Sequence, residues 1–302
     1  MKIGVLVMAH GTPASPAGIE PFYTRIRRGS APTPELLADL TRRYLAIGGT
    51  SPLTERTAAQ VAGIAHALER QAPGRFDVRF GSKFEPPLLE EAAESFVRDG
   101  FSKVVGLVLA PHSSSLSTGQ YMSRAKAALG DHIEFVAIDA WYNTAGFLEL
   151  IAQRVKDALA TIPPSRYDTT VVLFSAHSLP LKVLANGDTY AAQLRESAES
   201  AASLAGVANF DVVWQSAGRT ADPWLGPDIL EALREKRAKG VTDVVSCPIG
   251  FVSDHLEVLF DIDIEAQSVA REIGLTLVRT ASLNDDAAFT TLLAHAVRSA
   301  AS

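Results

Sequence analysis

The chain has 302 residues, of which 47% are hydrophobic and 21% are charged, and its formal net charge is -6. This balance is typical of a globular protein with about two domains, and it excludes a disordered or fibrous chain. The acidic net charge argues against nucleic acid as a partner. No apolar run approaches the ~18 residues of a membrane-spanning helix, so we expect no membrane span.

The cysteine content limits the redox chemistry. Cys247 is the only cysteine, so the chain cannot form an internal disulfide or supply the four thiolates of a typical iron–sulfur cluster. A single thiol fits a reducing cytoplasm, and the first apolar run, 3–8, is too short for a secretory signal peptide. We therefore expect a cytoplasmic protein without an iron–sulfur cluster.

Short apolar segments alternate with longer amphipathic ones along the chain. The predicted strands are 3–8, 76–80, 104–109, 135–138, 170–174, 210–214, 241–245 and 275–278. The predicted helices are 54–70, 87–99, 146–161, 189–204, 228–237 and 285–299. Continuous apolar strands that alternate with helices predict an α/β fold with parallel sheets covered on both faces.

The predicted strands fall into two groups of four, divided near residue 140. In each group one strand ends in a small polar cluster that contains a histidine, at 9–12 and at 175–178. The sequence thus predicts two similar domains, 1–140 and 141–302, with ligands beyond the carboxyl ends of the strands. Segment 13–49 is longer than usual βα connections, which favours a functional insertion. Which half the helix 285–299 packs on stays open.

The cluster at 175–178 carries a candidate catalytic histidine. His177 follows an apolar strand, has small neighbours, and is followed by a turn that Pro180 closes. One interpretation is a histidine that only bonds the local backbone. The other is an imidazole that projects into a cleft as a neutral metal ligand or base.

An acidic row between residues 253 and 265 is the second candidate. With Ser253 or Asp254 as the N-cap, Glu257, Asp261 and Glu265 fall at i, i+4 and i+8 on one face of a helix. A solvated acidic face is one interpretation. However, the intervening residues are apolar, which predicts burial, and buried carboxylates need protons or cations. Such a row would suit passing a divalent cation inward.

An arginine cluster is the third candidate. Five arginines lie within nineteen residues: Arg25, Arg27, Arg28, Arg42 and Arg43. In an acidic chain they indicate an anionic ligand, because guanidinium groups bind carboxylates through two parallel hydrogen bonds. A solvated helix face stays open. Tyr121 and residues 111–115 follow another strand end and are expected to face the same cleft.

In their order and separations these segments resemble the ferrochelatase family over essentially the whole chain, and most closely its soluble bacterial branch that acts on coproporphyrin III. The matching stretches are 7–13, 26–29, 43–49, 51–53, 175–180, 214–216, 222–227 and 248–261. The resemblance implies two similar Rossmann-like halves, each a four-stranded parallel sheet flanked by helices, with the porphyrin in the cleft between them. It also implies an enzyme of heme biosynthesis that inserts ferrous iron into a porphyrin and releases two protons.

The resemblance further implies roles for individual residues. The family's metal-site pair falls on His177 and Glu257, and its acidic row continues through Asp261 and Glu265. Its porphyrin-binding residues match Arg27, Arg43, Tyr44, Ser51 and Tyr121. We expect His177 to accept pyrrole protons while Glu257 relays protons or holds iron, with the reverse division open.

One position departs from the pattern of the branch. The residue after Met-Ala is commonly a tyrosine that can ligate product iron, and here it is His10. Because imidazole also binds iron, we predict that His10 contacts the porphyrin and is the axial ligand on the face opposite His177.

Substrate choice rests on the insertion. Segment 13–29 is polar and arginine-bearing, without the long apolar lip expected of membrane-docked relatives. This favours coproporphyrin III, with four propionates, over protoporphyrin IX, with two. A protoporphyrin IX ferrochelatase, a chelatase for another divalent metal and a non-enzymatic heme carrier are the alternatives. We expect a monomer whose ligands are porphyrin and ferrous iron, with no other cofactor and with transient contacts to neighbouring enzymes of heme biosynthesis.

Overall fold

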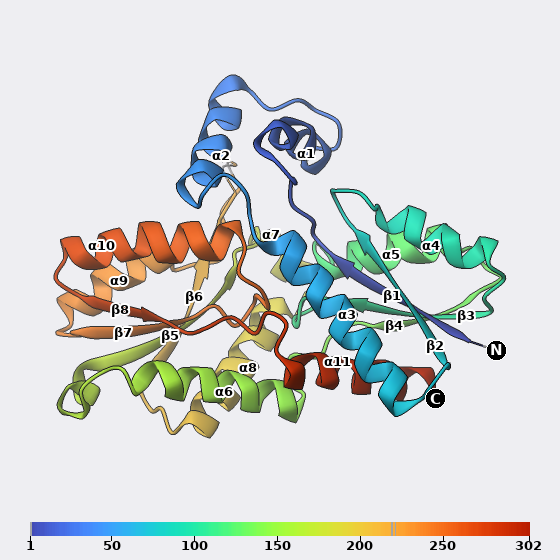
Figure 1. Cartoon of the computed structure of the whole chain (residues 1–302). Helices are drawn as coiled ribbons and strands as arrows, with labels where there is room; N and C mark the ends of the chain where they lie inside the picture. Colours follow the sequence, from blue (N-terminus) through green and yellow to red (C-terminus); the bar gives the residue numbers. More distant parts are fainter. Residues whose placement is uncertain (1, 219, 221) are drawn as a thin grey trace.

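Two parallel sheets of four strands each form the framework of the molecule (Figure 1). The computed structural model describes residues 2–218, 220 and 222–302. The first sheet has the order β2-β1-β3-β4 and the second the order β6-β5-β7-β8. The strands are β1 (Ile3–Ala9), β2 (Phe76–Ser82), β3 (Lys103–Val108), β4 (Glu134–Ile138), β5 (Thr170–His177), β6 (Phe210–Gln215), β7 (Asp243–Cys247) and β8 (Thr276–Arg279). The order within each half is therefore the same, and the predicted fold class is confirmed.

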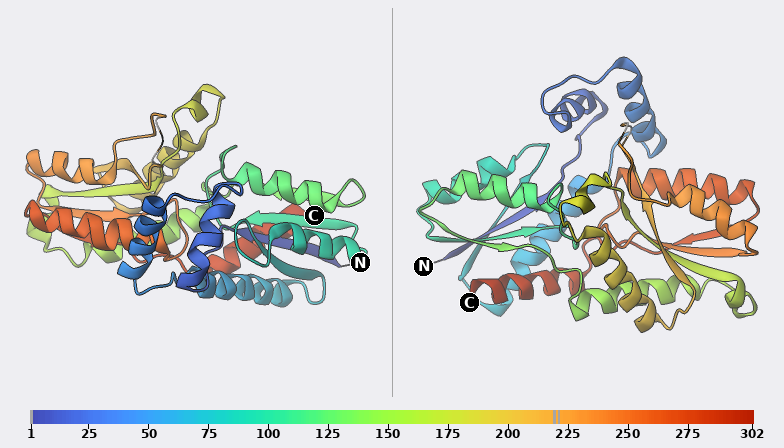
Figure 2. Two further views of the ribbon diagram at one scale, coloured as in Figure 1. Left: turned by 90° about the horizontal axis from the view of Figure 1, so that it is seen from above. Right: turned by 180° about the vertical axis from the view of Figure 1, so that it is seen from behind.

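Helices cover both faces of each sheet, as the alternating sequence pattern predicts (Figures 1 and 2). The main ones are α3 (Leu53–Gln71), α4 (Leu89–Arg98), α5 (Thr118–Leu129), α6 (Ala145–Leu159), α8 (Tyr190–Ala205), α9 (Ile229–Ala238), α10 (Gln267–Glu272) and α11 (Ala287–Ala301). The sequence analysis missed α5, although its buried residues Tyr121, Met122, Ala125 and Leu129 follow a helical spacing. Among the described residues no helix is both long and apolar enough to cross a membrane.

Two helices are exchanged between the halves. α6 follows the first sheet in the chain but packs against α8 and β7 of the second half. α11 follows the second sheet but packs against α3, β3 and β4 of the first half. The two exchanged helices also contact each other, and they lie along the same side of the molecule (Figure 1). Each half is thus completed by a helix whose sequence follows the other sheet.

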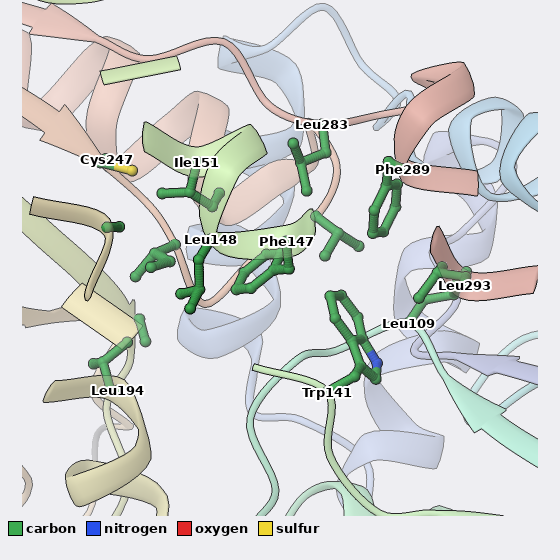
Figure 3. Packing of buried hydrophobic residues seen from close by; sticks show 14 of the residues in the cluster. Leu109, Trp141, Phe147, Leu148, Ile151, Leu194, Cys247, Leu283, Phe289 and Leu293 are labelled. Carbon is green, nitrogen blue, oxygen red and sulfur yellow. The ribbon is translucent and has the colours of Figure 1, made fainter. Parts of the chain in front are cut away.

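One of the hydrophobic clusters is continuous through both halves at the exchanged helices (Figure 3). Trp141, between β4 and α6, contacts Phe147 of α6 edge-on at 5.1 Å between ring centroids and Phe289 of α11 at 5.7 Å. The Trp141 indole N–H donates to the carbonyl of Val108 at 3.1 Å, which satisfies the one polar group of this buried ring. The shared core fixes the orientation of the two sheets and hence the shape of the space between their strand ends.

The insertion contains two helices that stand above the junction of the sheets (Figure 1). α1 (Ile19–Ile26) buries Ile19 and Phe22. α2 (Pro34–Ala46) begins with the favourable pair of an N-cap Thr33, whose hydroxyl accepts a hydrogen bond from the amide of Leu36, and a proline in its first turn. The sequence analysis did not delimit these helices, although Leu37, Leu40 and Tyr44 of α2 recur at helical spacing.

Candidate active site

A cavity of about 360 Å³ lies between the two halves at the carboxyl ends of the strands. Its lining includes six of the predicted site residues: His10, Tyr44, Ser51, Tyr121, His177 and Glu257. The other four, Arg27, Arg43, Asp261 and Glu265, are not among the residues that line it. A second hollow of about 560 Å³ beside β6 and α9 contains none of the predicted residues. The cavity between the halves is therefore the candidate site.

His177, at the end of β5, faces Glu257 across 3.5 Å from Nε2 to Oε1. The other carboxylate oxygen of Glu257 lies 3.6 Å from Nε2 of His255. The Nδ1 atom of His177 lies 2.5 Å from the carbonyl oxygen of Ser178, and that of His255 lies 3.0 Å from the carbonyl of Ser253. Both rings thus direct Nε2 toward one carboxylate.

Hydrogen bonds to the backbone carbonyls of His177 and Glu257 hold this pair in position. The hydroxyl of Tyr190 donates to the carbonyl of His177 at 3.1 Å, and the amide of Gln215 donates to the carbonyl of Glu257 at 3.2 Å. Gln215 is the last residue of β6 and is itself held by the hydroxyl of Ser175 at 2.9 Å. The reactive side chains are therefore fixed by the ends of two adjacent strands.

Charge coupling dominates the electrostatics of the pair. Burial alone lowers the pKa of His177, but the charge and hydrogen bond of Glu257, the Ser178 carbonyl and the charge of Asp261 together raise it to about 9. For Glu257 burial raises the pKa, yet the attraction of His177 and His255 outweighs it and holds the pKa well below its usual value. At neutral pH the pair therefore consists of an imidazolium and a carboxylate.

His10 occupies the corresponding place in the first half. It follows β1, the strand that has the same position in its sheet as β5, and its Nδ1 lies 3.0 Å from the carbonyl of Gly11. Its ring contacts Phe22 and Phe84 edge-on, at 5.8 and 4.8 Å between centroids. Desolvation by the surrounding protein lowers the pKa of His10, although the Gly11 carbonyl and the charge of Glu257 act to raise it. The ring is open to the cavity and offers a neutral nitrogen there.

Gly250 makes the placement of His177 sensitive to a single methyl group. A Cβ atom at residue 250 would lie 2.4 Å from Cβ of Ala176, the residue before His177. We expect Gly250→Ala to cost about 1–3 kcal/mol of stability by overpacking and to reduce activity by displacing His177. Unfolding curves and turnover measure both effects. Adding Ala176→Gly should restore part of each loss; no recovery in the double variant would contradict this account.

The acidic row lies on a helix of an unexpected kind. The predicted regular α-helix is wrong here, because Val258–Ala266 forms a π-helix. Ser253 and Asp254 are not its N-cap, since the helix begins at Leu256. The Asp254 carboxylate instead accepts hydrogen bonds from Arg279, Ser282 and Asn284. π-helical turns are rare and frequent at functional sites. The predicted burial of this segment is correct.

Asp261 lies one turn beyond Glu257 and is only 6% exposed. It accepts a short hydrogen bond from the hydroxyl of Ser216, and its Oδ1 lies 3.7 Å from Nη1 of Arg43. Burial and the nearby charge of Glu257 raise its pKa to about 6, although Ser216 and Arg43 act in the opposite direction. Glu265, two turns from Glu257, is half-buried.

The clustered arginines have different partners in the structure. Arg25 forms an ion pair with Glu85 at 2.6 Å and donates a hydrogen bond to the carbonyl of Phe84. Arg27 is exposed and lies over the ring of Tyr23. Arg42 and Arg43 both lie over Phe260 and both pair with Asp39 of α2. The insertion thus offers exposed positive charge at Arg27 and partly paired charge at Arg43.

Three polar residues at the cavity were missed or left without a role by the sequence analysis. His255 contacts Glu257, as described above. Lys83, which follows β2, is buried over the rings of Phe84 and Tyr121, and burial with Arg124 and Arg28 lowers its pKa to about 8. Burial lowers the pKa of His112 to about 3, and its Nε2 lies 2.7 Å from the hydroxyl of Ser197. The position of Lys83 after a predicted strand was a usable signal.

The chemistry available at this site is proton transfer and transient cation binding. Within the described part of the chain, no three side chains of His, Cys, Asp or Glu already surround a metal position. Instead, His10 of the first half and the pair of His177 and Glu257 of the second half line the same cavity. A ligand bound in this cavity would meet imidazoles from both halves.

The fold is that of the chelatases. Sirohydrochlorin chelatase SirB of Bacillus subtilis, solved with cobalt, superposes with a TM-score of 0.56 over 100% of this chain and 96% of that one, at 14% identity. CbiX, described as the terminal enzyme of siroheme biosynthesis in denitrifying bacteria, gives a TM-score of 0.56 over 99% of this chain and 100% of its own, at 14% identity.

Sequence comparison defines the family within this fold. The ferrochelatase family profile matches residues 2–301. A ferrochelatase of Herpetosiphon aurantiacus is 43% identical over 97% of both chains. A coproporphyrin III ferrochelatase of Bacillus pumilus is 42% identical over 98% of this chain and 96% of its own. The chain belongs to the ferrochelatase family, whose enzymes insert metal into porphyrin in heme biosynthesis.

Proposed function

We propose that this ferrochelatase inserts ferrous iron into coproporphyrin III and releases two protons. The observation that carries the proposal is the pair of His177 and Glu257, which lines one cavity between the halves together with His10. No cofactor beyond the two substrates is required by this chemistry. We also propose a monomeric, cytoplasmic enzyme that makes transient contacts with neighbouring enzymes of heme biosynthesis.

Proton removal is the task that the paired residues suit best. Two pyrrole N–H protons must leave as iron enters, and an imidazole is the usual acceptor near neutral pH. Glu257 raises the pKa of His177 and so keeps the imidazole protonated at neutral pH. A cation that approaches Glu257 weakens this hold, so His177 can release its own proton to the solvent and then accept one from a pyrrole. Proton acceptance by His177 and cation binding by Glu257 are thus coupled through their contact.

Coproporphyrin III is favoured by the cationic groups around the cavity. Lys83 lines it, and the insertion above it carries the exposed Arg27. The name of the Bacillus pumilus relative supports the same substrate. We expect Arg27→Gln to weaken coproporphyrin III more than protoporphyrin IX, as measured by fluorescence quenching on binding. Equal weakening of both would contradict a role in propionate binding.

His10 is proposed as the axial ligand of the product iron on the face opposite His177. Its lowered pKa keeps the ring neutral at physiological pH, which iron ligation requires. We expect His10→Ala to change the absorption and resonance Raman spectra of the bound iron product while iron insertion persists. His66→Ala, at an exposed position of α3, is the control. Spectra that are unchanged by His10→Ala would contradict the assignment.

Anaerobic incubation with ferrous iron tests the proposed function directly. The loss of porphyrin fluorescence is followed with coproporphyrin III and, separately, protoporphyrin IX. We expect faster turnover with coproporphyrin III and loss of turnover in His177→Ala. Faster turnover with protoporphyrin IX would overturn the substrate, and competition between ferrous iron and other divalent metals would identify a different metal. Tight porphyrin binding without insertion would indicate a carrier.

A further inference from the structure

The ring of His10 is in contact with two aromatic side chains from different segments of the chain. Phe84 belongs to the turn after β2, and its ring centroid lies 4.8 Å from that of His10. Phe22 belongs to α1 of the insertion, and its centroid lies 5.8 Å from that of His10 and 6.5 Å from that of Phe84. All three contacts are edge-on, the geometry in which the positive edge of one ring meets the negative face of another. The insertion therefore supplies one of the two rings that orient His10.

The backbone determines which nitrogen of His10 can bind a ligand. Its Nδ1 atom lies 3.0 Å from the carbonyl oxygen of Gly11, and because a carbonyl can only accept, Nδ1 carries the proton of the neutral ring. Nε2 then has the free lone pair, and none of the residues that the structure describes forms a hydrogen bond or ion pair with it. Metal-ligating histidines are usually oriented by such a bond from their other nitrogen. His10 is thus prepared to bind through Nε2.

An ion pair joins α1 to the turn that carries Phe84. Nη1 of Arg25 lies 2.6 Å from Oε2 of Glu85 and donates to the carbonyl of Phe84 at 2.9 Å. The amide of Phe84 donates in turn to the carbonyl of His10 at 3.1 Å. Arg25 and Phe22 are three residues apart on α1 and therefore share a face of the helix. One face of α1 thus contacts the His10 ring through Phe22 and binds the neighbouring turn through Arg25.

We propose that Arg25 and Glu85 are positioning residues for His10. Their ion pair keeps α1 against the turn, so that Phe22 holds the imidazole in the direction in which Nε2 binds the iron of the product. This inference rests on the proposed function, because it takes His10 as the axial ligand of iron coproporphyrin III. Coupling of this kind is reciprocal, so ligation of iron by His10 also tightens the docking of α1. The ion pair therefore slows the release of the iron product and not that of metal-free porphyrin, which offers His10 no metal to ligate.

The test compares the release of two ligands that differ only in the metal. Dissociation of iron coproporphyrin III and of metal-free coproporphyrin III is followed by stopped-flow displacement, through absorption and fluorescence respectively. We expect Arg25→Gln and Glu85→Gln each to raise the dissociation rate of the iron form roughly two- to fivefold, the range that a partly exposed ion pair supplies. The rate of the metal-free form should stay unchanged. In the same variants the resonance Raman spectrum of the bound iron product should shift toward that of His10→Ala.

Three further variants separate positioning from a merely structural role. Exchanging the charges, Arg25→Glu together with Glu85→Arg, should bring the dissociation rate of the iron form back toward that of the unsubstituted protein. Arg25→Gln in the His10→Ala background should cause no further rise, because the ligand that the ion pair positions is already absent. Arg98→Gln, which removes the same charge from an exposed arginine of α4, should leave both dissociation rates unchanged.

Two outcomes overturn the inference. One is an unchanged dissociation rate of the iron form in Arg25→Gln, and the other is an equal rise for the iron and metal-free forms, which would make α1 a cover of the cavity without a role in ligation. The iron-insertion assay separates this failure from failure of the proposed function. Insertion without an iron-specific effect would refute the positioning alone, whereas an iron-specific effect without insertion would support the positioning and refute the function.

Discussion

Glu257→Gln is expected to reduce iron insertion by roughly 10²–10⁴-fold, the usual contribution of a positioned proton-transfer group, and to lower the pKa of His177. Without the carboxylate charge the largest remaining influence on His177 is burial, which disfavours the imidazolium. The pKa should then fall well below about 9, although the Ser178 carbonyl and Asp261 still raise it. Titration of the labelled imidazole by NMR measures this shift without any substrate.

The sign of the pH dependence follows from the same pair. Because the folded-state pKa of His177 is raised, the stabilisation from its contact with Glu257 is complete below about pH 6.5 and is lost as the pH rises through about 9. Glu257→Gln should abolish this loss. Glu272→Gln, an exposed change of the same charge on α10, should retain it. A His177 that titrates alike in the unsubstituted protein and in Glu257→Gln would refute the coupling.

Phe289→Ala is expected to cost about 3–5 kcal/mol of unfolding free energy, as large truncations in a packed core do. Phe289 is fully buried on α11 and contacts Trp141, where the shared core joins the halves. Urea unfolding measures the cost, and Phe289→Leu is the milder variant if the alanine variant does not fold. A loss of unfolding free energy below about 1 kcal/mol would show that the surrounding core closes the space left by the Phe289 ring, and would contradict this prediction.

Phe96→Ala is the matched control for this prediction. Phe96 is equally buried but belongs to a separate cluster on the outer face of the first sheet. We expect a similar loss of stability from both alanine variants, but a loss of porphyrin affinity from Phe289→Ala alone, because only that residue lies where the halves meet. Equal loss of affinity would mean that the shared core does not set the cavity.

Much of the fold could be predicted because apolar residues recur with a different period in strands and in helices. The eight apolar strands and the division near residue 140 follow from local pattern alone. The predicted ends of the strands were less accurate. The strand predicted at 241–245 is β7, which lies at Asp243–Cys247. The division near residue 140 already places α6 in the second half, where it packs, but the packing of α11 on the first half stayed open, because an amphipathic helix shows which face is buried and not which sheet covers it.

The candidate site was predictable where a strand end points into it. His10, His177 and Tyr121 lie at or beyond strand ends, and all three line the cavity. The π-helical geometry around Asp261 could not be predicted, since its residues fit an α-helix equally well. The ion pair of Arg43 and Asp261 joins residues 218 positions apart, and only tertiary structure brings them together.

The exchanged helices bear on how the protein is made. Ribosomes extend chains at roughly 5–20 residues per second and domains tend to fold as they emerge. Here one face of the first sheet is covered by α3 and by α11, at Ala287–Ala301, so the part of that face over β3 and β4 lacks its helix until nearly 300 residues have been synthesised. The first half therefore has to wait, with apolar surface uncovered, while the second is translated, and a nascent chain paused before α11 should be a preferred substrate for chaperones.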